Sequence, residues 1–147
     1  MDFSWPALRR GRTPGTSWSN RSYSIGVSSK KPSGVIAEIH TKAQWQAYMD
    51  VSKANNKLLV IEFTANWCGP CRFVEPMMKE LAATYTDVDF VRIDVDEMAG
   101  IAEQFGVQVL PTFLLLRKGK EVGKVTGVKK KELQNKIEIM KLSYNGI

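Results

Sequence analysis

The stretch Trp67-Cys68-Gly69-Pro70-Cys71 determines the expected fold and chemistry of this 147-residue chain. Cys68 and Cys71 are its only cysteines, and they follow the apolar, strand-like run Leu58-Leu59-Val60-Ile61. Two thiols three positions apart can close a small disulfide loop and open it again. The spacing therefore indicates reversible dithiol chemistry and predicts an oxidoreductase.

The residues around the two thiols favour a reactive thiolate at Cys68. This cysteine is expected at the entry to a helix, where free backbone N–H groups and the helix dipole stabilise negative charge. Pro70 suits a first helical turn, Gly69 leaves room for a partner's backbone, and Arg72 adds a cation that favours a thiolate. Cys71 would lie one turn further in. Cys68 is therefore predicted as the nucleophile and Cys71 as the thiol that resolves the mixed disulfide.

A zinc site and a static disulfide are the structural alternatives for such a pair. Tetrahedral zinc needs about four ligands, and beyond the two cysteines the chain offers only His40 as a further soft ligand. A structural disulfide gains little from closing so short a loop. We therefore expect no metal site and a redox-active disulfide.

Positive charge is concentrated near the start of the chain. The formal net charge is +6, of which residues 1–33 contribute +5 and the remainder +1. This first stretch has too few apolar side chains to fold alone, and its Arg- and Ser-rich, acid-poor composition is typical of an organelle transit peptide. Arg21-Ser22-Tyr23-Ser24 resembles a mitochondrial processing site with cleavage before Ser24. A disordered basic extension is the alternative, so cytoplasmic and mitochondrial locations both stay open.

Composition also limits the classes of partner. The sequence has no run of about 18 apolar residues, so no transmembrane helix and no membrane partner are expected. The basic arm carries no nucleic-acid-binding motif, so no nucleic-acid partner is expected. Two vicinal thiols suit a reducing compartment. One folded domain over residues 34–147, present as a monomer, is the expected organisation.

Strand and helix patterns alternate through this domain. Strands are predicted over residues 35–40, 58–64, 88–95, 112–117 and 121–126, and helices over 41–55, 68–85, 99–105 and 131–142. The nearly continuous apolar run of 58–64 predicts a central strand, and Pro76 is expected to bend the second helix. The order βαβαβαββα predicts an α/β fold with a mixed central sheet flanked by helices on both faces.

Four segments carry a family resemblance. They are Phe63-Thr64-Ala65-Asn66-Trp67-Cys68-Gly69-Pro70-Cys71-Arg72, Asp94-Val95-Asp96-Glu97, Leu110-Pro111-Thr112-Phe113 and the turn at Gly127. With them, residues 34–147 resemble thioredoxin, most of all the h-type thioredoxins of plants. The resemblance implies the thioredoxin fold and a protein-disulfide reductase without a bound cofactor. Its substrates would be protein disulfides, and its electrons would come from thioredoxin reductase, an NADPH-dependent flavoenzyme, or from glutathione with glutaredoxin.

The resemblance also implies that Pro111 is a cis proline facing the disulfide. A cis bond is accessible essentially only before proline, and it exposes the preceding backbone. Val109 and Leu110 could then pair with an extended substrate strand. An ordinary proline at the start of a strand is the alternative.

Trp67 and the turn at Gly127 complete the groove that the resemblance implies. Trp67 would flank the active site and contact partners, whereas its alternative is a plain core tryptophan. Gly127, with Thr126 and Val128 beside it, would let a partner's chain approach, and its alternative is a simple turn glycine.

Glu62 departs from the family pattern. Thioredoxins generally have Asp at this place, buried beneath the second cysteine as a proton acceptor, whereas disulfide-isomerase domains resemble this chain in having Glu. A carboxylate within an apolar central strand is costly unless it is paired or functional. Burial would raise its pKa toward neutrality, as suits a general base. Glu62 is therefore predicted to accept the proton of Cys71, and a solvent-facing Glu is the alternative.

Two other functions compete with the reductase. A disulfide isomerase or oxidase is favoured by Glu62 and opposed by Gly69-Pro70, because oxidising isomerase domains usually carry Gly-His. A non-catalytic module could use the groove of Trp67, Leu110-Pro111 and Gly127 for binding alone. We expect catalysis because both thiols are intact.

Overall fold

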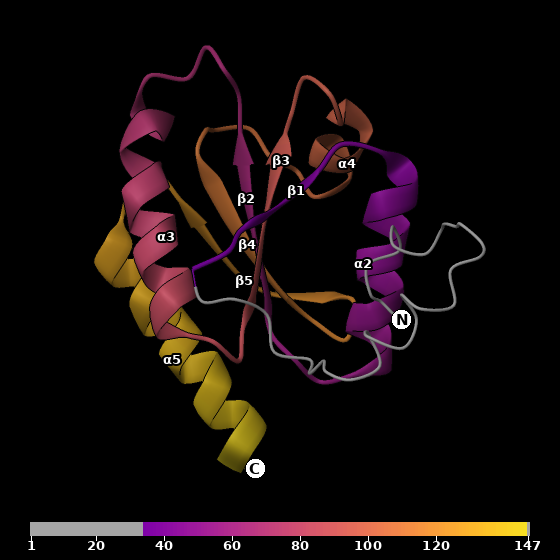
Figure 1. The fold of residues 1–147 in the computed structure, drawn as a ribbon, viewed down its shortest axis with the longest axis vertical. Coiled ribbons are helices and arrows are strands. Elements are labelled where there is room, and N and C mark those ends of the chain that lie inside the picture. The colour runs from indigo at the N-terminus through magenta and orange to yellow at the C-terminus, as the bar shows by residue number, and fades with distance from the viewer. Residues whose placement is uncertain (1–33, 147) are drawn as a thin grey trace, which may run out of the picture. The chain divides into compact units, whose positions relative to one another are not determined.

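The structure, a computed structural model, describes residues 34–146. The N-terminal extension over residues 1–33, with its predicted transit peptide and processing site, lies outside this range. The elements in chain order are β1 (Ala37–Ile39), α2 (Lys42–Ala54), β2 (Leu59–Thr64), the 3₁₀ turn η2 (Pro70–Phe73), α3 (Val74–Thr84), β3 (Asp89–Asp94), α4 (Ala99–Gln104), β4 (Thr112–Arg117), β5 (Lys120–Thr126) and α5 (Lys130–Gly146) (Figure 1).

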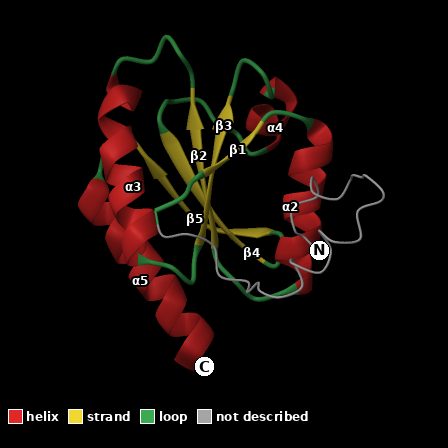
Figure 2. Ribbon diagram, viewed as in Figure 1, coloured by secondary structure: helices red, strands yellow, loops and turns green. Residues whose placement is uncertain are grey.

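A five-stranded mixed sheet forms the centre of the fold (Figure 2). Its strand order is β1-β3-β2-β4-β5, in which β1, β3 and β2 run parallel and β4 is antiparallel to both of its neighbours. The predicted mixed sheet and the central place of β2 are confirmed. β1 is shorter than the predicted strand over 35–40.

Helices cover both faces of the sheet, as predicted (Figure 1). Alternate residues of β2 point to opposite faces, so Val60 packs with residues of α3 and α5, whereas Ile61 and Phe63 pack with residues of α2 and α4. Glu62 is two residues after Val60, so its side chain points to the same face of the sheet. It therefore faces the α3 side of the sheet, which is the side on which the chain continues from the two cysteines.

A capping box starts α2 at the predicted residue. The Thr41 hydroxyl accepts a hydrogen bond from the Gln44 N–H at 3.1 Å, and the Gln44 side-chain oxygen accepts from the Thr41 N–H at 3.1 Å. These bonds satisfy donors that an α-helix leaves free at its N-terminus. Trp45 and Met49 are buried on the inner face of this helix.

The chain beyond the cysteines differs from the prediction of one helix bent at Pro76. A 3₁₀ turn, η2, comes first, and α3 begins only at Val74. Pro76 is therefore the third residue of α3, where a missing N–H removes no intrahelical bond. The change from 3₁₀ to α geometry takes the place of a bend within a single helix.

The predicted hairpin joins β4 to β5 through Lys118 and Gly119. Both residues have positive φ, 54° and 76°, as in the tight turns that match the twist of two paired strands. The Gly119 N–H donates to the buried Ser52 hydroxyl at 3.1 Å, which fastens the turn to α2. Within residues 34–146, no helix combines the length and apolarity needed to cross a membrane.

Replacement of Thr41 by Ala tests the cap of α2. The substitution leaves the Gln44 N–H without its capping hydroxyl, so the free energy of unfolding should fall by about 1 kcal/mol. Urea denaturation measures the change. Thr41→Ser is the matched control, because it keeps the hydroxyl and should retain most of the stability. Equal losses in both variants would contradict a role for the hydroxyl.

Candidate active site

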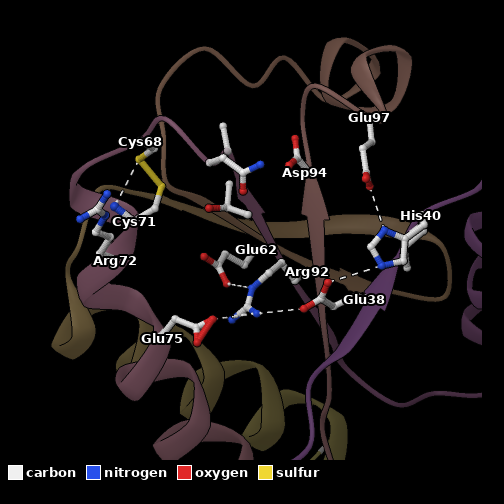
Figure 3. A pocket seen from close by; sticks show the side chains of 14 residues that line it. Glu38, His40, Glu62, Cys68, Cys71, Arg72, Glu75, Arg92, Asp94 and Glu97 are labelled. Carbon is white, nitrogen blue, oxygen red and sulfur yellow. Dashed lines mark hydrogen bonds and ion pairs between the residues drawn. A yellow bond between two sulfur atoms is a disulfide. The ribbon is translucent and has the colours of Figure 1, made fainter.

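Cys68 and Cys71 follow the carboxyl end of the central strand β2 and form a disulfide (Figure 3). Their Cα atoms are 5.4 Å apart, and each residue is only 6% exposed. The backbone N–H of Cys71 donates to the Cys68 sulfur at 3.2 Å. This N–H belongs to the first turn of η2, where donors have no partner within the turn itself. The structure thus places one N–H of a 3₁₀ turn, rather than the entry of an α-helix, against the Cys68 sulfur, and stabilisation of a thiolate there stays a prediction.

The residues between and beside the cysteines form a turn whose outer side is accessible to solvent. Pro70 is the first residue of η2, and the Arg72 N–H donates to the Gly69 carbonyl at 3.1 Å. A Cβ added at Gly69 would meet no atom within 4 Å, so the space beside the disulfide is free for another chain. The Arg72 side chain is exposed and lines the pocket below the disulfide.

Glu62 is buried beneath this part of the site, at 1% exposure. It lines the same cavity of about 400 Å³ as Cys68 and Cys71, so the solvent-facing alternative is wrong. Burial raises the pKa of its carboxyl, because the charged form loses hydration. The charge of Arg92 and its hydrogen bond act in the opposite direction without cancelling this effect.

Arg92 on β3 is the partner of Glu62, and sequence reasoning did not identify it. Its Nε donates to Glu62 Oε1 at 3.0 Å, and its Nη1 lies 2.9 Å from Glu75 Oε2 and 3.4 Å from Glu38 Oε2. Arg92 stands directly beside both Glu38 and Glu62 in the strand register. The signal that could have found it is the single cation of the strand predicted over 88–95, which lies between the apolar residues Val91 and Ile93.

His40 lies at the outer rim of the same cavity, where sequence reasoning considered it only as a zinc ligand. Its Nδ1 is 2.9 Å from Glu97 Oε1, and its Nε2 is 3.4 Å from Glu38 Oε1 (Figure 3). The hydrogen bond to Glu97 raises the pKa of the imidazole, and the charges of Glu97, Glu38 and Asp94 act in the same direction. In the described part of the chain, no group of three or more His, Cys, Asp or Glu side chains is arranged to hold a metal ion.

Trp67 is a surface residue rather than a core tryptophan. It is 69% exposed, and its indole N–H donates to Asp96 Oδ2 at 2.9 Å. Asp96 is itself held in the turn after β3, where its N–H donates to Asp94 Oδ1 at 2.7 Å. The hydrogen bond therefore orients a large exposed aromatic side chain next to Cys68.

The peptide bond between Leu110 and Pro111 is cis, as the resemblance implied. Leu110 packs against the two cysteines, whereas Val109 is 52% exposed. The Gly127 N–H donates to the Pro111 carbonyl at 2.8 Å, which joins the two loops. Gly127 has a φ of +90°, a backbone conformation that favours glycine and that an ordinary turn glycine also adopts. Its neighbours Thr126 and Val128 are exposed.

The raised pKa of Glu62 predicts how stability depends on pH. The folded chain holds this proton more tightly than the unfolded chain, so the resulting stability is present below the ordinary pKa of 4.5 and is lost as the pH rises through the raised value. We expect the wild type to lose stability relative to Glu62→Gln over that interval. Urea unfolding of both oxidised proteins at a series of pH values measures the difference. A difference that is independent of pH would contradict the raised pKa.

Comparison with known proteins agrees with this geometry. The family model that matches is Thioredoxin, over residues 36–139. Thioredoxin H2-1 of Oryza sativa subsp. japonica is 46% identical over 111 residues, which cover 76% of this chain and 80% of the relative. Thioredoxin H8 of Arabidopsis thaliana is 48% identical over 108 residues, covering 74% and 73%.

A solved structure extends the likeness to three dimensions. The crystal structure of thioredoxin NaTrxh from Nicotiana alata matches with a TM-score of 0.71 and 51% identity, over 78% of this chain and 98% of that chain. The fold, the disulfide-forming pair and the relatives thus agree with one another. The chain belongs to the thioredoxin family and is a protein-disulfide oxidoreductase whose redox-active pair is Cys68 and Cys71.

Proposed function

We propose that Cys68 attacks disulfides of other proteins and that Cys71 resolves the product. The observation that carries this assignment is the hydrogen bond from the Cys71 N–H to the Cys68 sulfur. A donor at this position stabilises negative charge on Cys68, and a thiolate is the reactive form of cysteine. The open space at Gly69 gives a substrate chain access to this sulfur.

The reaction transfers two electrons in two exchange steps. The Cys68 thiolate forms a bond to one sulfur of the target disulfide, and the other target sulfur leaves as a thiolate. The Cys71 thiolate then attacks the Cys68 sulfur and releases the first target sulfur. The target ends as a dithiol, and the protein ends with the Cys68–Cys71 disulfide that the structure contains.

Glu62 is the proposed acceptor of the Cys71 proton. It lines the same cavity as Cys71, and its raised pKa suits a group that must take up a proton near neutral pH. Water within the cavity can carry the proton where the two groups do not touch directly. Its buried position thus agrees with the role that the family has for Asp.

The proposed substrate groove lies on either side of the disulfide. Trp67 offers an oriented, exposed indole, and the backbone at Val109 and Leu110 would pair with an extended segment of the substrate. Pro111 follows this backbone directly, and its carbonyl accepts a hydrogen bond from the Gly127 N–H at 2.8 Å. On the far side, the segment Thr126-Gly127-Val128 would contact the same segment, whose close approach the glycine permits.

Thioredoxins act on protein disulfides and are reduced by thioredoxin reductase. For this chain we propose the same donor, with glutathione and glutaredoxin as the second source of electrons. Arg72 and Pro70 would then act on the reactivity of Cys68, and no bound cofactor is needed on the chain. The two vicinal thiols suit a reducing compartment, either cytoplasmic or mitochondrial, and we propose that the chain acts there as a monomer.

Glu62 also supports a second candidate, a disulfide isomerase or oxidase. Gly69-Pro70 opposes it, since oxidising isomerase domains usually carry Gly-His. The reduction potential separates the two functions, because about 30 mV corresponds to about 1.4 kcal/mol for a two-electron couple. A value near the thioredoxin level of about −270 mV supports the reductase, and one near about −180 mV supports the isomerase.

Insulin reduction with dithiothreitol as electron donor tests the reductase. The wild type should accelerate reduction well above dithiothreitol alone, and Cys71→Ser should lose this turnover because nothing resolves the mixed disulfide. The variant should instead accumulate a covalent complex with the insulin chain, visible by non-reducing electrophoresis. Turnover equal to dithiothreitol alone for the wild type would reject the general reductase. Full function in a Cys68→Ser, Cys71→Ser variant would indicate a binding module.

A reporter disulfide isolates the step assigned to Glu62. Attack of Cys68 on dithiobis(nitrobenzoate) releases one coloured thiolate, and attack of Cys71 on the mixed disulfide releases the second. Glu62→Gln should slow the second release by about 100-fold at neutral pH, the lower end for a positioned base. The loss should shrink as the pH passes the ordinary thiol pKa of about 8.5.

Glu62→Asp is the control for this measurement, because it keeps the carboxylate and shortens its reach by one methylene. It should retain most of the rate of the second release. If Glu62→Gln leaves that rate unchanged, another group accepts the proton of Cys71.

A further inference from the structure

Four charged side chains form a continuous row from beneath the disulfide to the solvent. We call Glu62, Arg92, Glu38 and His40 the charge row (Figure 3). Three of them come from neighbouring parallel strands, and Glu38, Arg92 and Glu62 are direct partners in the register of β1, β3 and β2. His40 follows β1 by one residue, so the row crosses three strands without a gap.

Exposure rises steadily along the charge row. The side chain of Glu62 is 2% exposed, that of Arg92 16%, that of Glu38 51% and that of His40 53%. The joining distances are 3.0 Å from Glu62 to Arg92, 3.4 Å from Arg92 to Glu38 and 3.4 Å from Glu38 to His40. Protonation of His40 at the exposed end is thus linked by direct ion pairs to the buried carboxylate of Glu62 at the other end.

A single guanidinium at Arg92 serves three carboxylates. Glu75 on α3 lies 2.9 Å from Nη1, the same nitrogen that faces Glu38, whereas Glu62 binds Nε. Arg92 keeps its charge throughout, since arginine is not deprotonated in proteins. The row therefore carries an electrostatic effect and no proton. Protonated His40 beside Glu38 offsets the negative charge of Glu38. The positive charge of Arg92 is then less offset by Glu38 and stabilises ionised Glu62 more strongly.

We propose that His40 is a positioning residue for the thiol-disulfide exchange, and that its charge, acting through Glu38 and Arg92, sets how readily Glu62 ionises. The proposal deepens the proposed function, because it rests on Glu62 as acceptor of the Cys71 proton. As the pH falls, His40 gains its proton and opposes the protonation of Glu62. The base thus stays available at a lower pH than its burial alone would allow.

The groups that surround His40 are compatible with this influence of its charge on Glu62. Glu97 on the turn after β3 binds His40, and Asp94 at the end of β3 adds to the negative field there. On the α2 side, Gln44 accepts from the His40 backbone N–H at 2.6 Å and fixes the residue without adding charge. The pKa of His40 and that of Glu62 are both raised, by the bond to Glu97 and by burial respectively. We therefore expect the two groups to titrate as a pair.

The only histidine of the chain gives a direct readout of this linkage. NMR titration of the full oxidised chain follows the His40 imidazole without reference to activity. By reciprocity, ionisation of Glu62 must raise the pKa of His40 as much as protonated His40 lowers that of Glu62. We expect a two-step His40 curve in the wild type, and a single step at lower pH in Glu62→Gln.

Two exposed carboxylates supply variants that leave the buried pair intact. Glu38→Gln interrupts the charge row and should remove the second step of the His40 curve. Glu97→Gln is the matched control, because it lowers the pKa of His40 but leaves the row connected, so the second step should remain. Identical His40 curves for the wild type and Glu62→Gln, or a second step that survives in Glu38→Gln, would overturn the proposal.

The reporter disulfide then tests the effect on the reaction. His40→Gln should slow the second thiolate release by about two- to fivefold near pH 6, and leave it unchanged near pH 9, where the imidazole is neutral in the wild type. In a Glu38→Gln background, His40→Gln should add nothing, as a double-mutant cycle requires of a transmitted effect. A loss of equal size at both pH values would indicate a structural role and reject the proposal.

These two readouts separate the proposal from the function on which it rests. If Glu62→Gln leaves the second release unchanged, the assignment of Glu62 as acceptor fails. The His40 titration still reports whether the charge row links the two groups. If the acceptor is right and the titration shows no linkage, only the role of His40 fails.

Discussion

The ion pair between Glu62 and Arg92 is the costly element around which the site is arranged. An ionised carboxylate that leaves water loses several kcal/mol, and its attraction to a nearby cation recovers this only when the geometry is good. Glu62 stands in the central strand at 1% exposure, so the neighbouring strand has to supply the cation. The apolar clusters on both faces of the sheet provide the stability that lets the fold keep such a pair.

The partners of Arg92 place this ion pair at a junction of several elements. Glu75 lies four residues after Cys71, so Arg92 connects the helix that follows the dithiol to the strands beneath it. Lysine could not replace arginine here without loss, because an ammonium is a point charge, whereas the guanidinium presents Nε and Nη1 in different directions. The shape of Arg92 thus allows one partly buried cation to hold a carboxylate from β2 and one from α3 at the same time.

Local signals in the sequence were sufficient for most of the fold. Thr41 and Gln44 predict the start of α2, and Lys118-Gly119 predicts a hairpin. The apolar run of β2 predicts a central strand. Each of these signals depends only on residues that are close together in the sequence. The 3₁₀ turn before α3 was missed, since helix periodicity does not distinguish the two geometries over four residues. β1 is shorter than the strand predicted over 35–40, and α5 is longer than the helix predicted over 131–142, because local patterns mark the ends of elements less sharply than their middles.

The residues of the active site fall into those that the sequence could identify and those that it could not. The dithiol and Glu62 were identified because a motif and a charge within an apolar run mark them in the sequence, and the cis proline was identified because the family resemblance implied it. Arg92 and His40 were not, because their roles depend on the register of three parallel strands that are distant along the chain. The sequence shows that a buried acid such as Glu62 requires a partner. Only the pairing of β3 with β2 shows that this partner is Arg92. The strand order thus places Arg92, and through Glu38 also His40, beside the buried carboxylate that the sequence had already marked.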